Sequence, residues 1–290
     1  MQLVILAAGH GRRFGGLKQL APVGPNGEAI MDFTARSALA SSYDGIVVIV
    51  REEIEEEITA HLRAFWPSEL AVEVVCQSPR AGTAPAVASA APALTGPFGV
   101  ANADDLYGSE ALALLRAHFD DRSDAGASSA RHTLVAYRLD QTILSDEPVR
   151  RGLCTLAPDG ALESIIESDV QMTPEGFLAT PRAHPEAGAT RTDGGAPVSM
   201  NLWGFHLRML DHLADALAAS AAAGEGTELL LSDVVGDLVA TGADAFQVHQ
   251  TTARCLGVTH REDLVVVRAE LEREFGAAAA DPERSARTAD

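Results

Sequence analysis

Short apolar runs rich in β-branched residues alternate with longer amphipathic segments through the first part of the chain. The short runs predict strands, and the longer segments, with apolar positions three and four residues apart, predict helices. The predicted strands are 3–6, 46–50, 72–76 and 98–101. The predicted helices are 29–40, 54–65, 83–91 and 109–119. This alternation indicates βαβ units, so we expect an α/β fold with a doubly wound, mostly parallel sheet.

The pattern changes after a polar connection at 120–129, and the second half has an antiparallel character. Strands are predicted at 132–139, 152–157, 162–167 and 198–206. The second and third of these flank a Pro-Asp-Gly turn at 158–160, which is typical of a hairpin. Helices are predicted at 207–222, 227–239 and 261–275. Residues 173–197, rich in Pro, Gly, Ala and Thr, predict a long loop near a site, with surface disorder as the alternative.

The length of 290 residues fits one large α/β domain with an elaborated second half. We expect a single domain over 1–276, divided into halves at 1–130 and 131–276. Residues 277–290 contain four consecutive alanines and scattered charges but no aromatic or large aliphatic side chain. This composition predicts a disordered tail.

The charge balance narrows the class of partner. The chain has 22 Lys and Arg against 41 Asp and Glu, a formal net charge of −19 at pH 7. A surface this acidic repels polyanions and anionic lipids, so we expect no nucleic-acid partner and no membrane association. No apolar stretch approaches the roughly 18 residues of a membrane span, and the apolar run at 3–8 is too short for a signal peptide.

Cysteine usage points to a reducing compartment. Cys76, Cys154 and Cys255 lie far apart, are odd in number and have no CxxC spacing. This arrangement argues against a disulfide framework and against a zinc site. We therefore expect a cytoplasmic protein. The sequence leaves open whether the protein forms a homo-oligomer.

The segment after the first strand has the clearest chemical pattern, Ala7-Ala8-Gly9-His10-Gly11-Arg12-Arg13-Phe14-Gly15-Gly16-Leu17-Lys18-Gln19-Leu20. Its glycines can turn tightly and present backbone N–H groups to an anion. A dinucleotide fold would need G-x-G-x-x-G, and here the third glycine comes one residue late. An NTP-hydrolysing P-loop would need G-K-[ST], which is absent. A glycine loop with two arginines and a following lysine suits a triphosphate and departing pyrophosphate.

Lys18 is the only lysine in the chain, because every other basic residue is arginine. A compact ammonium binds a phosphate as a point charge, whereas a guanidinium binds as a planar fork. An incidental surface lysine is the alternative interpretation. Its place within a glycine loop favours phosphate binding.

Two carboxylates, Asp104 and Asp105, follow the predicted buried strand at 98–101. Ligands bind at the carboxyl edge of parallel sheets, and a carboxylate there can hold Mg²⁺ against phosphate oxygens. Asp105 has two interpretations, a second metal-site carboxylate or a cap on the helix that begins near Ser109.

These motifs resemble the sugar-phosphate nucleotidyltransferases, whose members open with an L-A-x-G-x-G-x-R…K signature. The resemblance continues in the family's order over nearly the whole chain, at Gly82-Thr83-Ala84, Asn102-Ala103-Asp104-Asp105, Ile165-Ile166-Glu167, Ser199-Met200-Asn201-Leu202-Trp203-Gly204-Phe205 and Gly257-Val258-Thr259. It implies a Rossmann-like nucleotidyltransferase core, with the NTP in the half 1–130 and the acceptor in the half 131–276. The partners implied are an NTP and a small phosphorylated acceptor, with Mg²⁺ as cofactor.

The resemblance also implies roles for individual residues. Catalytic and phosphate-binding roles are expected for Arg13, Lys18 and Asp104. Nucleotide contacts are expected from Ala8, Gly9, Gly11, Gln77, Gly82 and Thr83. Acceptor contacts are expected from Glu167 and Asn201, and metal contacts from Asp104 and Asp105.

The chain departs from the family pattern at two positions. Many relatives have a second metal-binding Asp near the chain end, where this chain has Gly257. Many also follow the glutamate that matches Glu167 with a lysine that contacts the sugar phosphate, whereas here Ser168 follows. Another arginine is expected to replace that lysine, with Arg191 as the candidate, unless the acceptor differs from an ordinary sugar 1-phosphate.

The resulting hypothesis is transfer of a nucleoside monophosphate from an NTP to a sugar 1-phosphate, with release of pyrophosphate and formation of an NDP-sugar. One alternative is cytidylyl transfer to a non-sugar acceptor, because Arg-Phe-Gly-Gly-Leu-Lys also resembles the loop of molybdenum-cofactor and polyol-phosphate cytidylyltransferases. Another is a catalytically silent regulatory homologue. Retention of Arg13, Lys18 and Asp104 argues against the silent form. The nucleobase and the acceptor are left open.

Overall fold

The structure, a computed structural model, describes residues 1–11, 14–78, 82–120, 131–144, 147–224 and 228–276. The predicted tail at 277–290 and nearly all of the polar connection at 120–129 lie outside the described residues. No helix within the described ranges is both long and apolar enough to cross a membrane.

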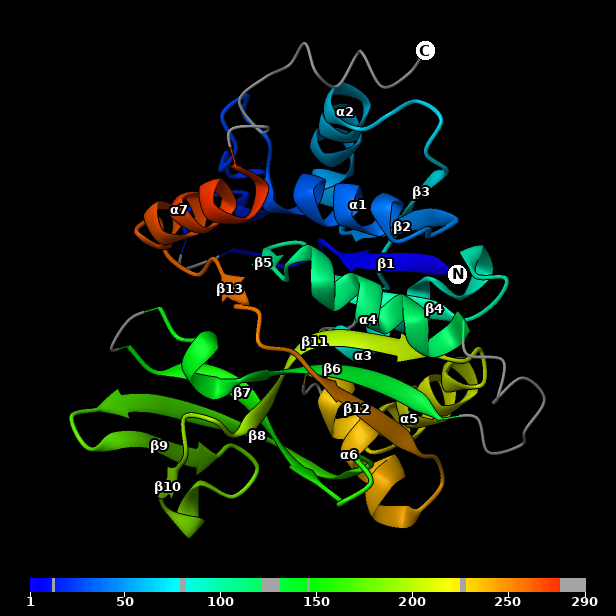
Figure 1. Cartoon of the computed structure of the whole chain (residues 1–290). Coiled ribbons are helices and arrows are strands. Elements are labelled where there is room, and N and C mark those ends of the chain that lie inside the picture. Colours follow the sequence, from blue (N-terminus) through cyan, green and yellow to red (C-terminus); the bar gives the residue numbers. More distant parts are fainter. Residues whose placement is uncertain (12–13, 79–81, 121–130, 145–146, 225–227, 277–290) are drawn as a thin grey trace.

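A parallel sheet forms the first half of the protein (Figure 1). Its strands are β1 (Gln2–Leu6), β2 (Gly45–Val50), β3 (Val72–Cys76) and β4 (Phe98–Asn102), in the spatial order β4-β1-β2-β3. β1 pairs in parallel with both β2 and β4, and β2 pairs in parallel with β3. The predicted α/β class and doubly wound sheet are confirmed.

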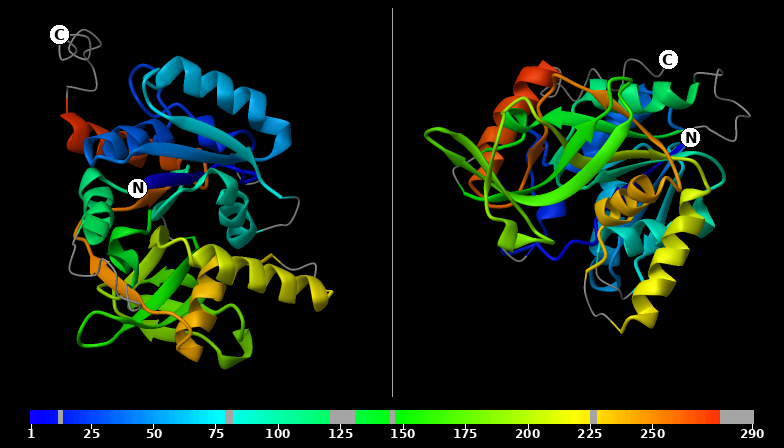
Figure 2. Two further views of the ribbon diagram at one scale, coloured as in Figure 1. Left: turned by 90° about the vertical axis from the view of Figure 1, so that its right-hand side faces the viewer. Right: turned by 90° about the horizontal axis from the view of Figure 1, so that it is seen from below.

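Helices cover both faces of this sheet because alternate side chains of each strand point to opposite sides. From β1, Leu3 and Ile5 enter one apolar cluster, whereas Val4 and Leu6 enter the other. The first cluster is completed by α1 (Ile30–Ala40), α2 (Glu55–Phe65) and α4 (Ser109–Asp120). The second is completed by α3 (Thr83–Ser89), α5 (Met209–Ala222) and α6 (Leu231–Thr241). The left view of Figure 2 shows α4 and α5 on opposite sides of the sheet.

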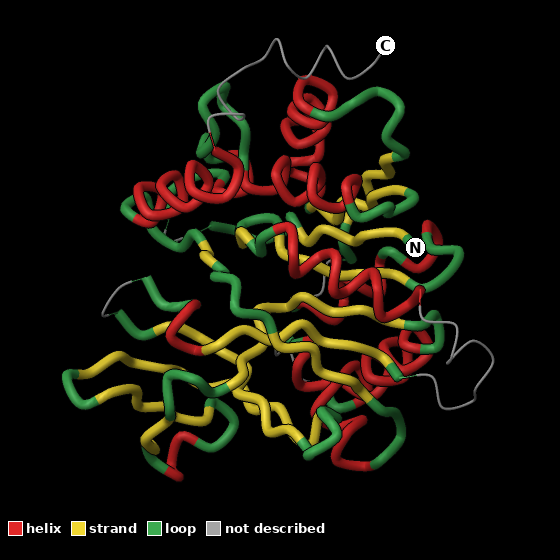
Figure 3. The backbone as a smooth tube through the Cα atoms, in the orientation of Figure 1, coloured by secondary structure: helices red, strands yellow, loops and turns green. Residues whose placement is uncertain are grey.

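Antiparallel strands extend the sheet beyond β4, in the order β10-β9-β8-β7-β11-β4. Their bounds are β7 (Val149–Leu156), β8 (Leu162–Thr173), β9 (Gly176–Pro181), β10 (Thr190–Thr192) and β11 (Pro197–Phe205). β6 (His132–Arg138) pairs with β11 and with β12 (Phe246–Gln250). Strand dominates this part of the chain, at the lower left of Figure 3.

The structure corrects one prediction in this region. The segment 173–197 is not a long loop, because it contains β9, the 3-10 helix η6 (Pro185–Ala187) and β10. Backbone pairing between Thr190–Thr192 and 177–179 gives these residues regular partners. The antiparallel elaboration of the second half is confirmed.

The end of the chain returns to the first half. β13 (Leu256–Gly257) pairs with β5 (Asp105–Leu106), and α7 (Asp263–Phe275) follows it. Val267 and Leu271 of α7 join a third apolar cluster with Phe14, Ile30 and Phe33. The other short helices among the described residues are η1 (Lys18–Leu20), η2 (Glu52–Ile54), η3 (Ala91–Ala93) and η5 (Leu139–Gln141). The glycine loop is therefore packed between α1 and the returning chain end.

Candidate active site

A cleft of about 830 Å³ lies at the carboxyl edge of the parallel strands. Leu6 and Asn102 are partners at the ends of β1 and β4, so the segments that follow both strands start side by side. β11 runs antiparallel to β4, which brings its Asn201 to the same edge. The other walls come from β7, β8, and the segments before α6 and α7. The two halves of the chain thus meet in one cleft.

Ala8, Gly9 and His10 of the glycine loop line one wall of the cleft, and the backbone directly after them requires glycine at Gly11. Gly11 has a φ of 56°, and a Cβ there would lie 2.6 Å from the carbonyl oxygen of Gly16. The Gly11 carbonyl accepts hydrogen bonds from the N–H groups of Phe14 and Gly15. Arg13, the predicted phosphate ligand of this loop, lies outside the described residues.

Two residues that the sequence analysis missed hold the start of the loop. Gln19 is buried, and its Nε2 donates to the carbonyl oxygens of Ala7 at 2.9 Å and Gly9 at 2.5 Å. Arg51, directly after β2, donates from Nη1 to the carbonyl oxygens of Ala8 at 3.3 Å and Gly9 at 2.7 Å. The side chains of Gln19 and Arg51 thus bind the backbone carbonyl groups of residues 7–9, at the start of the loop. The position of Gln19 beside the lone lysine was the available signal.

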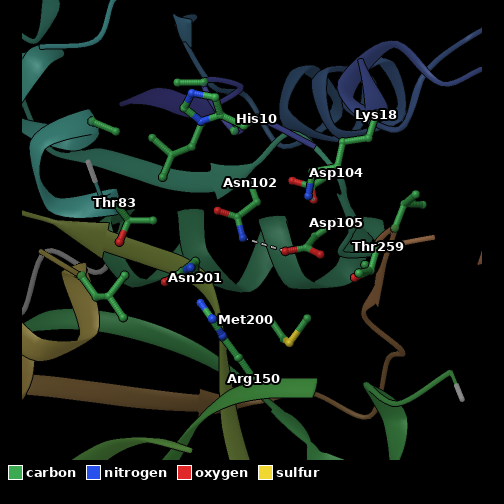
Figure 4. Close-up of a pocket in the computed structure, with 18 of the residues that line it drawn as sticks. His10, Lys18, Thr83, Asn102, Asp104, Asp105, Arg150, Met200, Asn201 and Thr259 are labelled. Carbon is green, nitrogen blue, oxygen red and sulfur yellow. Dashed lines mark hydrogen bonds and ion pairs between the residues drawn. The ribbon is translucent and has the colours of Figure 1, made fainter. Parts of the chain in front are cut away.

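Lys18 forms an ion pair with Asp104 across the cleft wall. The Lys18 side chain is 21% exposed and that of Asp104 is 18% exposed, so both remain accessible from the cleft. Lys18 comes from η1 after the glycine loop, and Asp104 comes from the turn after β4. Figure 4 shows both at the upper right of the cleft, with Arg150 pointing toward it from below. The structure therefore places the predicted ammonium and the predicted metal ligand together.

Asp105 is buried beneath this ion pair. Its Oδ2 accepts a hydrogen bond of 2.7 Å from Asn102 Nδ2, drawn in Figure 4. Burial and the neighbouring charge of Asp104 raise the pKa of Asp105 to about 6. The alternative role of capping the helix near Ser109 belongs to another residue, because the Ser109 N–H donates to Glu274 Oε1 at 2.8 Å.

The predicted nucleotide-contact residues after β3 also line the cleft. Gly82 has a φ of 121°, and a Cβ there would lie 2.1 Å from the carbonyl oxygen of Leu229, so only glycine fits. The Thr83 hydroxyl accepts a 2.8 Å hydrogen bond from the Leu231 N–H at the start of α6. Gln77 lines the same wall and donates from Nε2 to the Gly82 carbonyl at 3.3 Å. This wall is joined directly to the second half of the chain.

Glu167 and Asn201, the predicted acceptor contacts, line the cleft from the second half. Burial raises the pKa of Glu167, and the Ser232 hydroxyl forms a hydrogen bond with its carboxylate. Gly152 lies opposite Glu167 on β7 and leaves room for it. Asn201 has a φ of 60°, which Asn tolerates better than most residues. Its Oδ1 accepts from Trp203 Nε1 at 3.3 Å, so Nδ2 is the donor left for a ligand.

Arg191 is not the cation that replaces the missing lysine. It lies on β10 and donates to the carbonyl oxygen of Glu175 at 3.0 Å and to the carboxylate of Glu175 at 3.3 Å, away from the cleft. The arginines that line the cleft among the described residues are Arg51, Arg150, Arg151 and Arg182. None of these four arginines was predicted from the sequence, because their approach to the cleft depends on the pairing of distant segments.

The donor chemistry near Asp104 fits Mg²⁺. Carboxylate oxygens are hard ligands, and proteins commonly hold Mg²⁺ through one or two carboxylates together with substrate phosphates. Asp104 supplies one such carboxylate at the cleft wall, and Asp105 supplies a second immediately beneath it. Within the described ranges, no group of three or more His, Cys, Asp or Glu side chains could hold a metal ion. Substrate oxygens would therefore have to complete the coordination.

Comparisons with known proteins agree with this architecture. The MobA-like NTP transferase domain matches residues 3–232 of the chain. A search of curated proteins gave no match. The fold is similar to a Bacillus anthracis structure described as a candidate glucose-1-phosphate thymidylyltransferase in complex with sucrose, with a TM-score of 0.67 and 12% identity over 93% of this chain and 94% of that chain. It is also similar to the inositol-1-phosphate CTP transferase from T. maritima, with a TM-score of 0.62 and 13% identity over 93% and 96%.

Proposed function

The chain belongs to the MobA-like NTP transferase family, and from that premise we propose that it transfers a nucleoside monophosphate from an NTP to a sugar 1-phosphate. The products are pyrophosphate and an NDP-sugar. The observation that carries the proposal is the Lys18–Asp104 pair at the end of the glycine loop, in a cleft lined by both halves of the chain. A cation and a metal-binding carboxylate are thereby available at the place where phosphates would meet the loop.

The NTP occupies the first half of the cleft in this proposal. The loop at 8–11 contacts its phosphates, helped by Arg13 and Lys18. Gln77, Gly82 and Thr83 contact the base and ribose from the opposite wall. Gln19 and Arg51 act as positioning residues, because they bind the carbonyl groups at the start of the loop.

Asp104, with Asp105 beneath it, would hold Mg²⁺. When bound, Mg²⁺ would neutralise charge on the phosphates during the displacement. Lys18 contacts the Asp104 carboxylate in the structure. Its ammonium therefore lies close enough to the proposed metal site to bind the NTP phosphates there.

The chemical step is a direct displacement. An oxygen of the acceptor phosphate forms a bond to the α-phosphorus, and the bond from that phosphorus to the bridging β-phosphate oxygen breaks, so that pyrophosphate leaves with the electron pair. A phosphate monoester is anionic near neutral pH, so no side chain has to remove a proton. The residues of the cleft have mainly to position two anions and reduce their repulsion.

Glu167 and Asn201 orient the acceptor in this proposal. A carboxylate accepts hydrogen bonds from hydroxyl groups and an amide Nδ2 donates to their oxygens, so the two suit a polyhydroxylated molecule. The second candidate is cytidylyl transfer to a polyol phosphate. It is favoured by the fold shared with the inositol-1-phosphate CTP transferase. Both candidates require a phosphorylated, hydroxyl-rich acceptor.

Pyrophosphate release tests the proposal and separates the two candidates. The four NTPs are combined with Mg²⁺ and with a panel of hexose 1-phosphates, inositol 1-phosphate and glycerol 3-phosphate. We expect release with one NTP and at least one sugar 1-phosphate, and loss of release when the phosphate is omitted from the acceptor. Release with CTP and a polyol phosphate alone would establish the second candidate. Failure of every combination, together with no stabilisation of the protein by any NTP, would overturn both.

A further inference from the structure

Arg151, on β7, places a guanidinium in the wall of the cleft between the two halves. Its Nε donates to Thr142 Oγ1 at 2.9 Å, one Nη donates to the Arg150 carbonyl at 2.7 Å, and the other donates to the Thr142 carbonyl. A guanidinium has five N–H donors. These contacts therefore use three of them and fix the group, while one N–H on each terminal nitrogen remains for another partner.

Among the described residues, no carboxylate forms an ion pair with Arg151. The residue is partly exposed, yet its guanidinium is desolvated enough that burial lowers its pKa. Asp105 and Glu167 act on it electrostatically, but no carboxylate of the described chain lies within ion-pair distance of it. All three of its hydrogen bonds go to neutral oxygens. A desolvated cation of this kind is stabilised most by an anion that can accept two parallel N–H bonds.

The location of Arg151 indicates which anion that is. Arg151 lines the same cleft as Asp105, on the metal-binding side, and Glu167, on the acceptor side, and both carboxylates interact with its charge. Arg51, by comparison, donates to the carbonyl groups of Ala8 and Gly9 within the glycine loop. An anion at Arg151 would therefore lie between the acceptor's hydroxyl groups and the α-phosphate of the NTP.

The small residue at position 168 leaves room for the Arg151 guanidinium. Arg151 and Ser168 are directly opposite partners on β7 and β8, so their side chains emerge on the same face of the sheet. Ser168 is buried, and its side chain is short enough for the guanidinium to occupy the space on this face. Glu167 is the partner of Gly152 and emerges on the other face.

We propose that Arg151 forms a phosphate subsite in the acceptor half of the cleft. The assignment of the anion to the acceptor rests on the proposed function. In that reaction the two remaining N–H groups bind the acceptor's phosphate and direct one of its oxygens toward the α-phosphorus. The substrate class is a phosphate monoester, and a neutral sugar or polyol does not fill the subsite.

Binding of inorganic phosphate, measured by isothermal titration calorimetry, tests the subsite without turnover. Arg151→Ala should weaken phosphate binding about 10- to 100-fold, the usual effect of losing a charge-assisted pair of hydrogen bonds. The double variant Arg151→Ala with Ser168→Lys should recover binding to within about threefold of wild type, because the lysine emerges opposite position 151. Arg191→Ala, outside the cleft, is the matched control and should bind like wild type.

Recovery in the double variant separates phosphate binding from a structural role. A lysine at 168 cannot restore all three bonds that Arg151 makes to Thr142 and Arg150, so a purely structural arginine would not be rescued. Should Arg151→Ala fail to fold, Arg151→Gln removes the charge while keeping a polar donor, and Ser168→Lys is added to that variant. Unchanged phosphate affinity in the folded single variant, or no recovery in the folded double variant, would overturn the proposal.

Kinetics distinguish this inference from the proposed function. With an active acceptor, Arg151→Ala should raise the acceptor KM at least tenfold and leave the NTP KM within a few-fold. Active transfer with an unchanged acceptor KM would reject the subsite and keep the function. Phosphate binding that depends on Arg151, in a protein that releases no pyrophosphate with any NTP, would keep the subsite and reject the function.

Discussion

Gly257 faces Asp105 on the short ladder between β13 and β5, and a Cβ at position 257 would lie 2.3 Å from Asp105 Oδ1. A carboxylate at 105 and any side chain at 257 thus compete for one space. Asp105 cannot withdraw easily, because it is buried and accepts a hydrogen bond from Asn102. The glycine at 257 therefore accompanies a buried carboxylate that enters from the neighbouring strand.

Replacing Gly257 by Ala should therefore displace the Asp105 carboxylate. The expected loss is about 1–3 kcal/mol in the free energy of unfolding, the usual range for overpacking a buried site. Transfer should also need more Mg²⁺, because the carboxylate beneath Asp104 has moved. Urea denaturation and a Mg²⁺ titration measure the two effects. Gly96→Ala is the control, since a Cβ there meets nothing within 4 Å. Equal stability of the two variants would contradict the competition for space.

The pKa of Asp105 predicts a pH dependence of stability. Because its pKa is raised from 3.8 to about 6, the folded protein binds a proton at Asp105 more tightly than the unfolded chain does. Its contribution to stability is therefore fully present below about pH 4 and is lost as the pH rises through about 6. Asp105→Asn cannot lose a proton. Relative to wild type, this variant should gain about 1–3 kcal/mol between about pH 4 and about pH 7.

Urea denaturation of both proteins at the two pH values gives this difference, and other titrating groups cancel in the comparison. Asp159→Asn provides a matched carboxylate control, because hydrogen bonds from the Ala161 N–H and Arg131 lower the pKa of Asp159. That variant should change in the opposite direction or not at all. A constant difference between Asp105→Asn and wild type at both pH values would show that Asp105 titrates normally.

The two carboxylates should differ in their effect on metal dependence. Asp104 lies at the cleft wall, whereas Asp105 is buried and held by Asn102. We therefore expect Asp104→Asn to raise the Mg²⁺ concentration for half-maximal transfer far more than Asp105→Asn does. Titration of Mg²⁺ against initial rate in both variants measures the ranking. A larger effect of Asp105→Asn would reverse the two roles.

The parallel half of the fold could be predicted from the sequence because three of its strands, β1, β2 and β4, are almost entirely buried. All residues of β2 are buried, for example, and they form one continuous apolar run at its predicted position. β12 has no such continuous apolar run, and the alternation of Phe246 and Val248 with Gln247 and His249 covers only five residues, which is a weak strand signal. β10 and β13 are three and two residues long and exist through pairing with other segments. Strands this short are too brief to show a repeating pattern of apolar and polar residues in the sequence.

The residues of the candidate site also differ in whether a local sequence pattern marks them. The glycine loop, Lys18 and Asp104 could be found because a local spacing or a strand end marks each of them. Arg51 could not, since its partners are backbone carbonyl groups that any sequence would supply, and the only signal for Gln19 was its position beside the lone lysine. The choice of Arg191 was wrong because β10 pairs with β9, and this pairing turns Arg191 toward Glu175. The sequence contains no local pattern that predicts the pairing.

Lys18→Ala should leave the fold intact and reduce the rate of transfer about 10²- to 10³-fold, as the loss of a group that stabilises transition-state charge usually does. Its ammonium contributes little packing, so the melting temperature should change by no more than a few degrees. Lys18→Arg keeps the charge but not the compact geometry, and should recover part of the rate. Steady-state rates with saturating NTP decide the matter. Near-normal turnover of Lys18→Ala would end the phosphate-binding role.

Glu167 and Asn201 provide the test of where the acceptor binds. Glu167→Ala should raise the acceptor KM or lower turnover while NTP binding stays within a few-fold, because Glu167 faces the second half of the cleft. Asn201 has a φ of 60°, which glycine adopts without strain. Asn201→Gly therefore removes the amide without backbone strain, whereas Asn201→Ala adds about 1 kcal/mol of strain.

Both variants at 201 should weaken acceptor use alike, since both lose Nδ2, and only Asn201→Ala should also lower stability. Acceptor and NTP titrations with each variant, together with urea denaturation, separate these effects. Should NTP affinity collapse in Glu167→Ala, or should neither Glu167→Ala nor Asn201→Gly alter acceptor kinetics, the acceptor binds elsewhere. A retained acceptor KM in Asn201→Gly with a raised one in Asn201→Ala would instead assign the effect to backbone strain, and would remove Asn201 from the acceptor contacts.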